Sequence, residues 1–167
     1  MKAIDKALRI LEENPNLIKS SKGHIDKELI EKAEMFLDIK FPSSYKKFLT
    51  HYGFLSLGGD EIYGIIDDNF TDSSVPDAIW LTVAQRNRFG LPHHLMPIYD
   101  LGEGTKYCLD VSQMNEEQEC PVVVWPINGY EATPVLEVEA ENFGQFLLNI
   151  VQEALECESD EESGYFS

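Results

Sequence analysis

The sequence predicts an α+β domain, because helical and extended patterns occupy separate stretches of the chain. In the first half apolar residues recur at helical spacing, as Tyr45, Phe48, Leu49 and Tyr52 illustrate. From Leu95 onwards, short β-branched and aromatic runs alternate with turn residues, and one amphipathic helical pattern closes the chain. Elements grouped in this way favour a twisted, mainly antiparallel or mixed sheet that is flanked by helices.

The first two helices are expected over residues 2–13 and from Asp26 onwards. The first carries an apolar stripe and is stopped by Asn14-Pro15-Asn16, since proline cannot continue the hydrogen-bond ladder of a helix. Asp26 is suited to the N-cap of the second helix, and Ile25 and Ile30 are spaced to close a hydrophobic staple around it.

A third helix is expected between Pro42, a residue that suits a first turn, and Gly53, which suits the C-terminal stop. Residues 61–66 then alternate in a way that predicts a strand. Residues 76–88 carry a weaker helical period and predict a fourth helix.

The second half is expected to contain strands that are joined by turns. Its strongest strand pattern is Val122–Trp125, which is β-branched and aromatic throughout. Gly102-Glu103-Gly104 and Asn128-Gly129 are turn signals, and Asn142 is placed to cap a final helix. The expected strands are residues 96–99, 106–110, 122–125 and 135–138, and the final helix carries Phe143, Phe146, Leu147, Ile150, Val151 and Ala154 on one face.

The length of 167 residues favours one domain, which can bury a core without disulfides or metals. We place this domain at residues 1–156. Residues 157–167 are rich in Glu and Ser and lack apolar periodicity, so we expect an acidic, disordered tail there.

The charge of the chain is strongly negative. Asp and Glu number 30 and Lys and Arg 13, which gives a formal net charge of -17. Binding to nucleic acid depends on Lys and Arg that neutralise phosphates, so this field repels DNA, RNA and anionic membranes. The same field attracts basic protein surfaces and accelerates encounter with them. We therefore expect a protein partner, with no direct contact to nucleic acid or membrane.

Cysteine usage and the N-terminus favour a cytoplasmic protein. Cys108, Cys120 and Cys157 form no CxxC pair, and an odd count fits free thiols in a reducing compartment. The N-terminus becomes charged within one helical turn, which leaves no signal-peptide core, and no apolar run approaches the ~20 residues of a membrane span. Because an acidic protein repels itself, we expect a monomer or at most a weak homodimer.

A search for catalytic and metal-binding signatures predicts neither an enzyme nor a cofactor. The chain contains no phosphate-binding glycine loop and no nucleophile elbow. His93 and His94 are adjacent and would point to opposite faces of a strand, which disfavours a shared metal ion. Ser43 and Ser44 lie at a helix start, where capping explains them.

A set of short stretches, taken in order, resembles a known family. The stretches are Phe41-Pro42-Ser43-Ser44-Tyr45-Lys46-Lys47-Phe48-Leu49, Tyr52-Gly53, Ile62-Tyr63-Gly64-Ile65, Leu91-Pro92, Tyr107-Cys108-Leu109-Asp110, Cys120-Pro121-Val122-Val123-Val124-Trp125 and Phe143-Gly144-Gln145-Phe146-Leu147. Their order is similar to that of the SUKH superfamily, the Smi/Knr-like domains. The resemblance covers nearly the whole chain except the first helix and the acidic tail.

This resemblance implies a SUKH-like α+β domain and a role in protein binding. Bacterial members of the superfamily are typically immunity proteins (antitoxins) that block a cognate polymorphic or contact-dependent toxin, often a nuclease. A nuclease cleft that binds phosphate is basic, so an acidic inhibitor would be steered to it. We expect the partner-binding face to comprise loop carboxylates and an aromatic anchor, namely Asp67, Asp68, Asp72, Asp77, Trp80 and Glu103.

Two other functions are consistent with the sequence. The fungal branch of the superfamily implies a regulatory interaction scaffold with no toxin partner. The many carboxylates also leave a hydrolase as a third alternative, which strongly raised carboxyl pKa values in one cleft would support.

Overall fold

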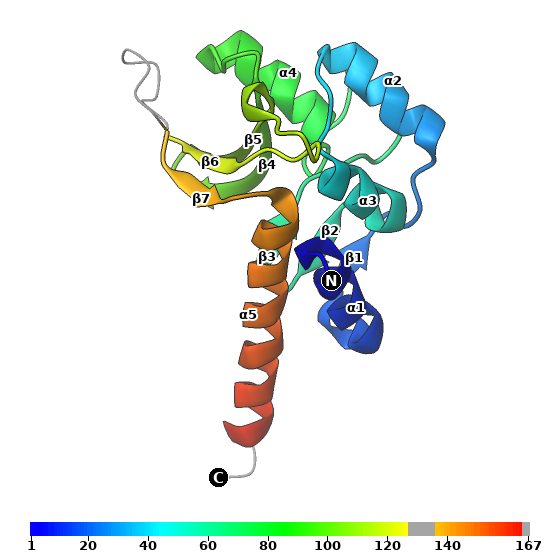
Figure 1. The fold of residues 1–167 in the computed structure, drawn as a ribbon, viewed down its shortest axis with the longest axis vertical. Coiled ribbons are helices and arrows are strands. Elements are labelled where there is room, and N and C mark those ends of the chain that lie inside the picture. The colour runs from blue at the N-terminus through cyan, green and yellow to red at the C-terminus, as the bar shows by residue number, and fades with distance from the viewer. Residues whose placement is uncertain (127–135, 165–167) are drawn as a thin grey trace.

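The computed structural model describes residues 1–126 and 136–164, with side chains as far as Glu161 (Figure 1). The chain forms an α+β domain, as predicted. Its helices are α1 (Ala3–Glu13), α2 (Lys27–Leu37), α3 (Ser43–Tyr52), α4 (Ala78–Phe89) and α5 (Phe143–Gly164), with 3-10 turns η1 (Pro15–Leu17) and η2 (Val111–Gln113). Its strands are β1 (Ser20–Ser21), β2 (Leu55–Leu57), β3 (Asp60–Ile62), β4 (Leu95–Gly102), β5 (Thr105–Asp110), β6 (Val122–Trp125) and β7 (Val138–Ala140).

The strands form two antiparallel sheets, so the antiparallel alternative is the correct one. The small sheet has the order β1-β2-β3 and the larger one is a meander in the order β4-β5-β6-β7. The two sheets meet where the Tyr63 N–H donates a hydrogen bond to the Ile98 carbonyl at 2.8 Å.

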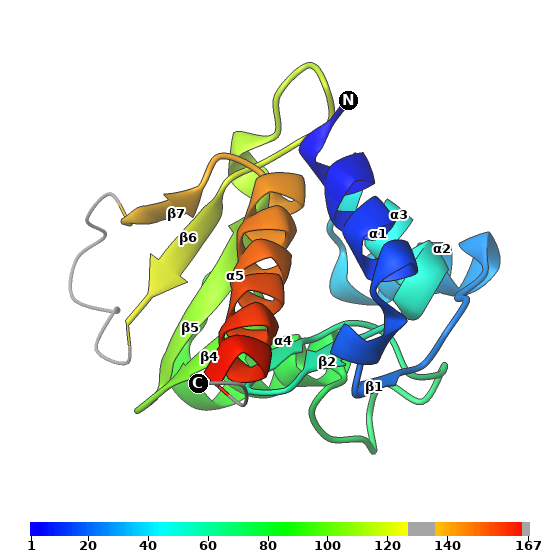
Figure 2. The ribbon, with the colours of Figure 1, turned by 90° about the horizontal axis from the view of Figure 1, so that it is seen from below.

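Helices cover both faces of the larger sheet. On one face, Phe146 of α5 packs its ring against Tyr99 and Tyr107, at centroid distances of 6.0 and 5.4 Å. Figure 2 shows α5 on the near side of β4 and β5, with α4 beyond them. The face toward α4 carries Cys108 and Val123, which pair across β5 and β6 and belong to a second apolar cluster.

The main core lies between the sheets and the helices, around α3. Tyr45, Phe48 and Phe143 are fully buried, and Phe143 packs within 5.0 and 5.2 Å of the other two rings. The Tyr45 hydroxyl donates a hydrogen bond to the Tyr63 carbonyl at 2.8 Å, so this polar atom is satisfied within the core. α3 is thereby fixed to α5 and to the segment after β3.

The helix caps follow the sequence closely. The Asp26 carboxylate accepts a hydrogen bond from the Leu29 N–H at 2.9 Å, and the Asn142 side-chain oxygen accepts one from the Gln145 N–H at 2.8 Å. Gly53 ends α3 with a φ of 71°, a conformation that glycine adopts without steric cost.

Two expected strands differ from the structure. Residues 61–66 are extended only as far as Ile62, because Gly64 then comes against the end of α3, where the Ile65 N–H donates to the Gly53 carbonyl at 2.9 Å. Of the expected strand 135–138, residues 136 and 137 are outside any strand, and β7 begins at Val138. Val135 and the predicted turn at Asn128-Gly129 lie outside the described residues.

The C-terminal segment also differs from the prediction. Residues 157–164 continue α5 as a regular helix, where a disordered tail was expected. Helix growth is favourable once a helix is nucleated, because each added residue contributes one hydrogen bond. The Asn16 amide also contacts Glu158, which ties this end of α5 to the chain beside α1. The domain boundary at residue 156 therefore does not coincide with the end of the helix.

Candidate functional site

Three of the predicted acidic residues share one loop. Asp67, Asp68 and Asp72 lie between β3 and α4, and all three side chains are exposed. Asp67 accepts a hydrogen bond from the Asn69 N–H at 2.9 Å, which folds the loop back on itself. Asp68 faces α2, where its carboxylate lies 3.6 Å from the Lys32 ammonium group. This loop therefore presents carboxylates beside α2.

Asp77 is not part of a binding surface, which corrects the prediction. Its side chain is fully buried and caps α4, accepting hydrogen bonds from the Ile79 and Trp80 N–H groups at 2.9 and 3.1 Å. Burial raises the pKa of this carboxyl, and the Trp80 and Ile79 hydrogen bonds oppose the rise. An aspartate directly before a helical pattern is an N-cap signal, so the sequence contained the correct assignment.

Glu103 does not join the loop carboxylates in one patch, whereas Trp80 lies in the first turn of α4, after the acidic loop. Trp80 is half-buried and packs against the main core. Glu103 is exposed in the β4–β5 turn, next to Gly104, which lies beside Gln85 and Phe89 near the end of α4. The acidic loop precedes the start of that helix, so about 18 Å of helix separates the two positions.

A surface that the sequence-based prediction missed lies along α2. Met35 is 80% exposed, and it lines two hollows, one on each side of the helix. The first, called here the 111–118 hollow, has a volume of about 620 Å³ and is lined by Glu34, Met35, Asp38, Ile39, Lys40, Val111, Met114, Asn115 and Gln118. The second, the 68–71 hollow, has a volume of about 450 Å³ and is lined by Lys32, Met35, Phe36, Asp68, Asn69, Phe70 and Thr71.

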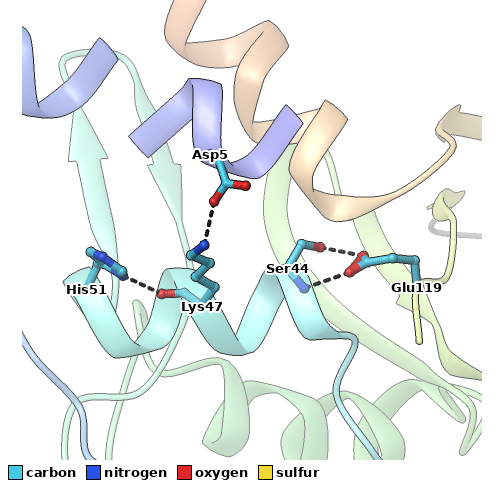
Figure 3. Close-up of polar contacts among 5 residues, drawn as sticks. All are labelled: Asp5, Ser44, Lys47, His51 and Glu119. Atoms are coloured by element: carbon cyan, nitrogen blue, oxygen red, sulfur yellow. Dashed lines mark hydrogen bonds and ion pairs between the residues drawn. The ribbon is translucent and has the colours of Figure 1, made fainter. Parts of the chain in front are cut away.

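Glu119 holds the outer wall of the 111–118 hollow in place. Its carboxylate accepts hydrogen bonds from the Ser44 N–H at 2.7 Å and the Ser44 hydroxyl at 2.5 Å (Figure 3). The Ser43 N–H donates to the Gln118 carbonyl at 2.8 Å. α3 is thus capped by a residue from the β5–β6 loop, and this cap also positions that loop opposite α2. The serines were expected to cap the helix themselves, but Pro42 is at the N-cap position without a side-chain cap, and Glu119 supplies the acceptor.

Figure 3 also shows one contact between α3 and α1 and one within α3. Lys47 forms an ion pair with Asp5 of α1, and a ring nitrogen of His51 lies 2.9 Å from the Lys47 carbonyl oxygen. The hydrogen bond between the Asp5 carboxylate and Lys47 lowers the pKa of that carboxyl. The ion pair joins α3 to α1.

Arg86 fixes the C-terminal end of α2. Its guanidinium donates hydrogen bonds to the Leu37 carbonyl at 3.1 Å and the His93 carbonyl at 3.0 Å. Asp38, which follows Leu37, is the C-cap of α2 and has the left-handed conformation with a φ of 56°. The side chain of Asp38 is consequently turned out to solvent, where it is 95% exposed beside the 111–118 hollow.

Among the described residues, no group of three or more His, Cys, Asp or Glu side chains could hold a metal ion. Cys108 and Cys120 are buried, and burial raises the pKa of the Cys120 thiol to about 12. Thiolate is the reactive form of cysteine, so these two side chains are not suited to nucleophilic chemistry. None of the helices in the described ranges combines the length and apolar character that a bilayer span requires.

A comparison with family models identifies the domain. The model SUKH_5, described as SMI1-KNR4 cell-wall, matches residues 4–152. This chain belongs to the SMI1-KNR4 family. The match confirms the SUKH resemblance, and it includes α1, which the resemblance drawn from the sequence left out.

Solved structures contain the same fold. A crystal structure of a protein from Pseudomonas syringae pv. tomato is similar to this SMI1-KNR4 domain with a TM-score of 0.54 and 20% sequence identity. The similarity covers 72% of this chain and 83% of that one. At this identity the match shows a shared fold and carries no information on the partner.

Proposed function

We propose that this SMI1-KNR4 protein is an immunity protein that binds a cognate polymorphic or contact-dependent toxin and occludes a basic surface of it. The proposal needs no catalytic group, and a nuclease domain is the kind of toxin that suits it best. The observation that carries it is the formal net charge of -17 on a member of this family. A nuclease that must bind phosphate offers the complementary field.

Several cations of the chain form ion pairs within the fold, and Asp and Glu outnumber Lys and Arg by 30 to 13. Lys32 pairs with Asp68 at 3.6 Å, and Lys46 lies 3.6 Å from the buried Glu34. Lys47 is paired with Asp5. The field that an approaching basic protein meets is therefore dominated by Asp and Glu.

Co-expression tests this function. A toxin domain encoded beside the gene of this protein would be produced in a susceptible cell with and without the protein. We expect survival only when both are present, and a complex that elutes as one peak from a sizing column. Electrostatic steering further predicts that the association rate constant falls steeply as salt is added, whereas a salt-independent rate would contradict the role of charge.

A regulatory scaffold is the second candidate, and the description of the matching family model as cell-wall favours it. A scaffold would associate with cellular regulators without protecting against any toxin. Absence of a toxin gene beside this one would place the scaffold first.

A further inference from the structure

The α2 helix buries one apolar stripe and leaves two other apolar side chains exposed. Ile30, Ala33 and Leu37 face the core, while Met35 is 80% and Phe36 43% exposed. A single exposed apolar residue on a protein surface needs no explanation. Met35 differs because it forms the ridge between the 111–118 hollow and the 68–71 hollow, so an incoming side chain can contact it on either side.

Both hollows have apolar walls that are already in place. Val111 and Met114 pack against the core from the loop side of the 111–118 hollow. In the 68–71 hollow the Phe36 and Phe70 rings pack in a tilted arrangement at a centroid distance of 5.1 Å. The Glu119 cap and the Arg86 hydrogen bonds hold the surrounding segments. Binding to preformed walls loses little conformational entropy, and flexible Met side chains adapt to differently shaped partners.

The rim of this surface is acidic. Asp38 is 95% exposed beside the first hollow, and Asp67 and Asp72 lie in the loop that borders the second. Within the described part of the chain, neither Asp67 nor Asp72 forms an ion pair, and the neighbour of Asp38 is His93 at 3.8 Å. Lys32 on the same face is neutralised by Asp68. Lys40 also lines the first hollow, so Asp38, Asp67 and Asp72 outnumber the one cation of this face that forms no ion pair among the described residues. A basic partner would thus find a surplus of carboxylates around an apolar centre.

We propose that Met35 and the two flanking hollows form the docking surface for a basic partner protein. Apolar side chains of the partner would enter both hollows, and its Lys or Arg side chains would face Asp38, Asp67 and Asp72. This arrangement of an apolar centre within a charged rim is typical of protein interfaces. The inference rests on the proposed function and adds the location of the binding face. A second copy of this chain is a poor occupant, because both surfaces would carry the same charge.

A pair of substitutions tests the apolar centre. Met35→Gln keeps the size and helix propensity of the side chain and removes its apolar character. Val138→Thr is the matched control, since Val138 is 54% exposed on β7, on the opposite side of the molecule from α2 (Figures 1 and 2). With the co-expressed toxin domain as the probe, we expect Met35→Gln to weaken the Kd at least about tenfold with an unchanged Tm, and the control to leave it unchanged. Equal affinities of the two variants would overturn the docking surface.

The acidic rim is tested through the rate of association. Asp38→Asn combined with Asp67→Asn removes two rim charges, and Glu103→Gln combined with Glu137→Gln removes two exposed charges from the distant β4–β5 turn and the residue before β7. We expect the first variant to associate several-fold more slowly than the second at low salt, and the difference to shrink as salt is added. Equal rates would remove these carboxylates from the interface.

The docking surface can also be tested separately from toxin immunity. If wild-type protein neither rescues cells nor binds the toxin domain, the proposed function is wrong. The docking surface is then tested with a cationic amphipathic peptide of Leu and Lys as the probe. Amide shifts in an NMR titration that centre on α2 and residues 68–71 and 111–118, and that Met35→Gln abolishes, would support the surface. Shifts centred elsewhere would overturn it. Self-association of wild-type protein that Met35→Gln abolishes would identify a second copy as the occupant and overturn the basic partner.

Discussion

α2 and α3 follow one another in the chain and have nearly the same length, yet they use their apolar residues differently. α3 buries Tyr45, Phe48 and Leu49 completely. α2 buries one stripe and leaves Met35 exposed between two hollows. The stability of the domain therefore depends on α3 and its contacts, whereas α2 can change its outer face without affecting the fold. Substitutions in the two helices should separate stability from binding.

The largest expected effect comes from the glycine that packs against the end of α3. A Cβ atom at Gly64 would overlap the Gly53 carbonyl oxygen and also crowd Leu49. We expect Gly64→Ala to lower the free energy of unfolding by more than about 4 kcal/mol, or to prevent folding, because backbone atoms cannot move aside.

Gly59→Ala is the matched control for this substitution, because a Cβ at Gly59 meets open space. It should change the free energy of unfolding by less than about 0.5 kcal/mol. Urea unfolding followed by circular dichroism measures both variants. Similar midpoints for Gly64→Ala and Gly59→Ala would mean that the close approach to α3 is absent.

The next effect compares the two helices directly. Phe48→Ala leaves a cavity in the fully buried aromatic cluster of α3 and should cost about 3–5 kcal/mol. Met35→Ala removes an exposed side chain from α2 and should change stability by no more than about 0.5 kcal/mol. Chemical denaturation of both variants checks the difference. A large loss of stability in Met35→Ala would show that α2 is a core element.

A smaller effect is expected where the β5–β6 loop caps α3. Glu119→Gln removes the charge from the two hydrogen bonds to Ser44 and should cost about 1–2 kcal/mol. It should also speed hydrogen exchange of the Ser44 amide. Glu117→Gln, at an exposed position of the same loop, is the control and should leave both quantities unchanged. If both variants behave like wild type, the cap does not hold the wall of the 111–118 hollow.

The smallest effect is a pH dependence at the start of α4. Burial raises the pKa of Asp77 in the folded protein above its ordinary value of 3.8. The folded state then binds this proton more tightly than the unfolded chain. The contribution of Asp77 to the free energy of unfolding consequently falls as the pH rises through the window that begins at 3.8.

Asp77→Asn keeps a side-chain oxygen for the cap and removes the titration. We expect wild type to lose stability relative to this variant as the pH rises through the same window. Urea midpoints of both proteins between pH 3 and pH 7 measure the difference. A difference that stays constant with pH would mean that Asp77 titrates normally in the folded state.

Local signals predicted much of the fold. The caps at Asp26 and Asn142, the limits of α3 and the strand Val122–Trp125 all depend on residues close in sequence, and all were predicted within a residue or two. Glu61–Ile66 was predicted too long, because the contact between Gly64 and the end of α3 joins segments that periodicity cannot relate.

The candidate site was predicted only in part. The acidic loop was found from its composition, but Asp77 proved to be a buried cap. Met35 carried a weak signal, as an apolar residue off the apolar stripe of its helix. Its two hollows had none, since their walls come from three separate segments of the chain.

By itself, the sequence determined the fold class, the family resemblance, the helix caps and the acidic charge, because each follows from composition or from neighbouring residues. Only the tertiary structure decided which carboxylates are exposed to solvent and which are buried or hydrogen-bonded within the fold. Glu119 caps α3 across a separation of 75 residues, and Glu34 is buried while Asp38, four positions later, is exposed. Such differences arise from packing between distant segments, which determines whether a charged side chain meets water or a protein partner.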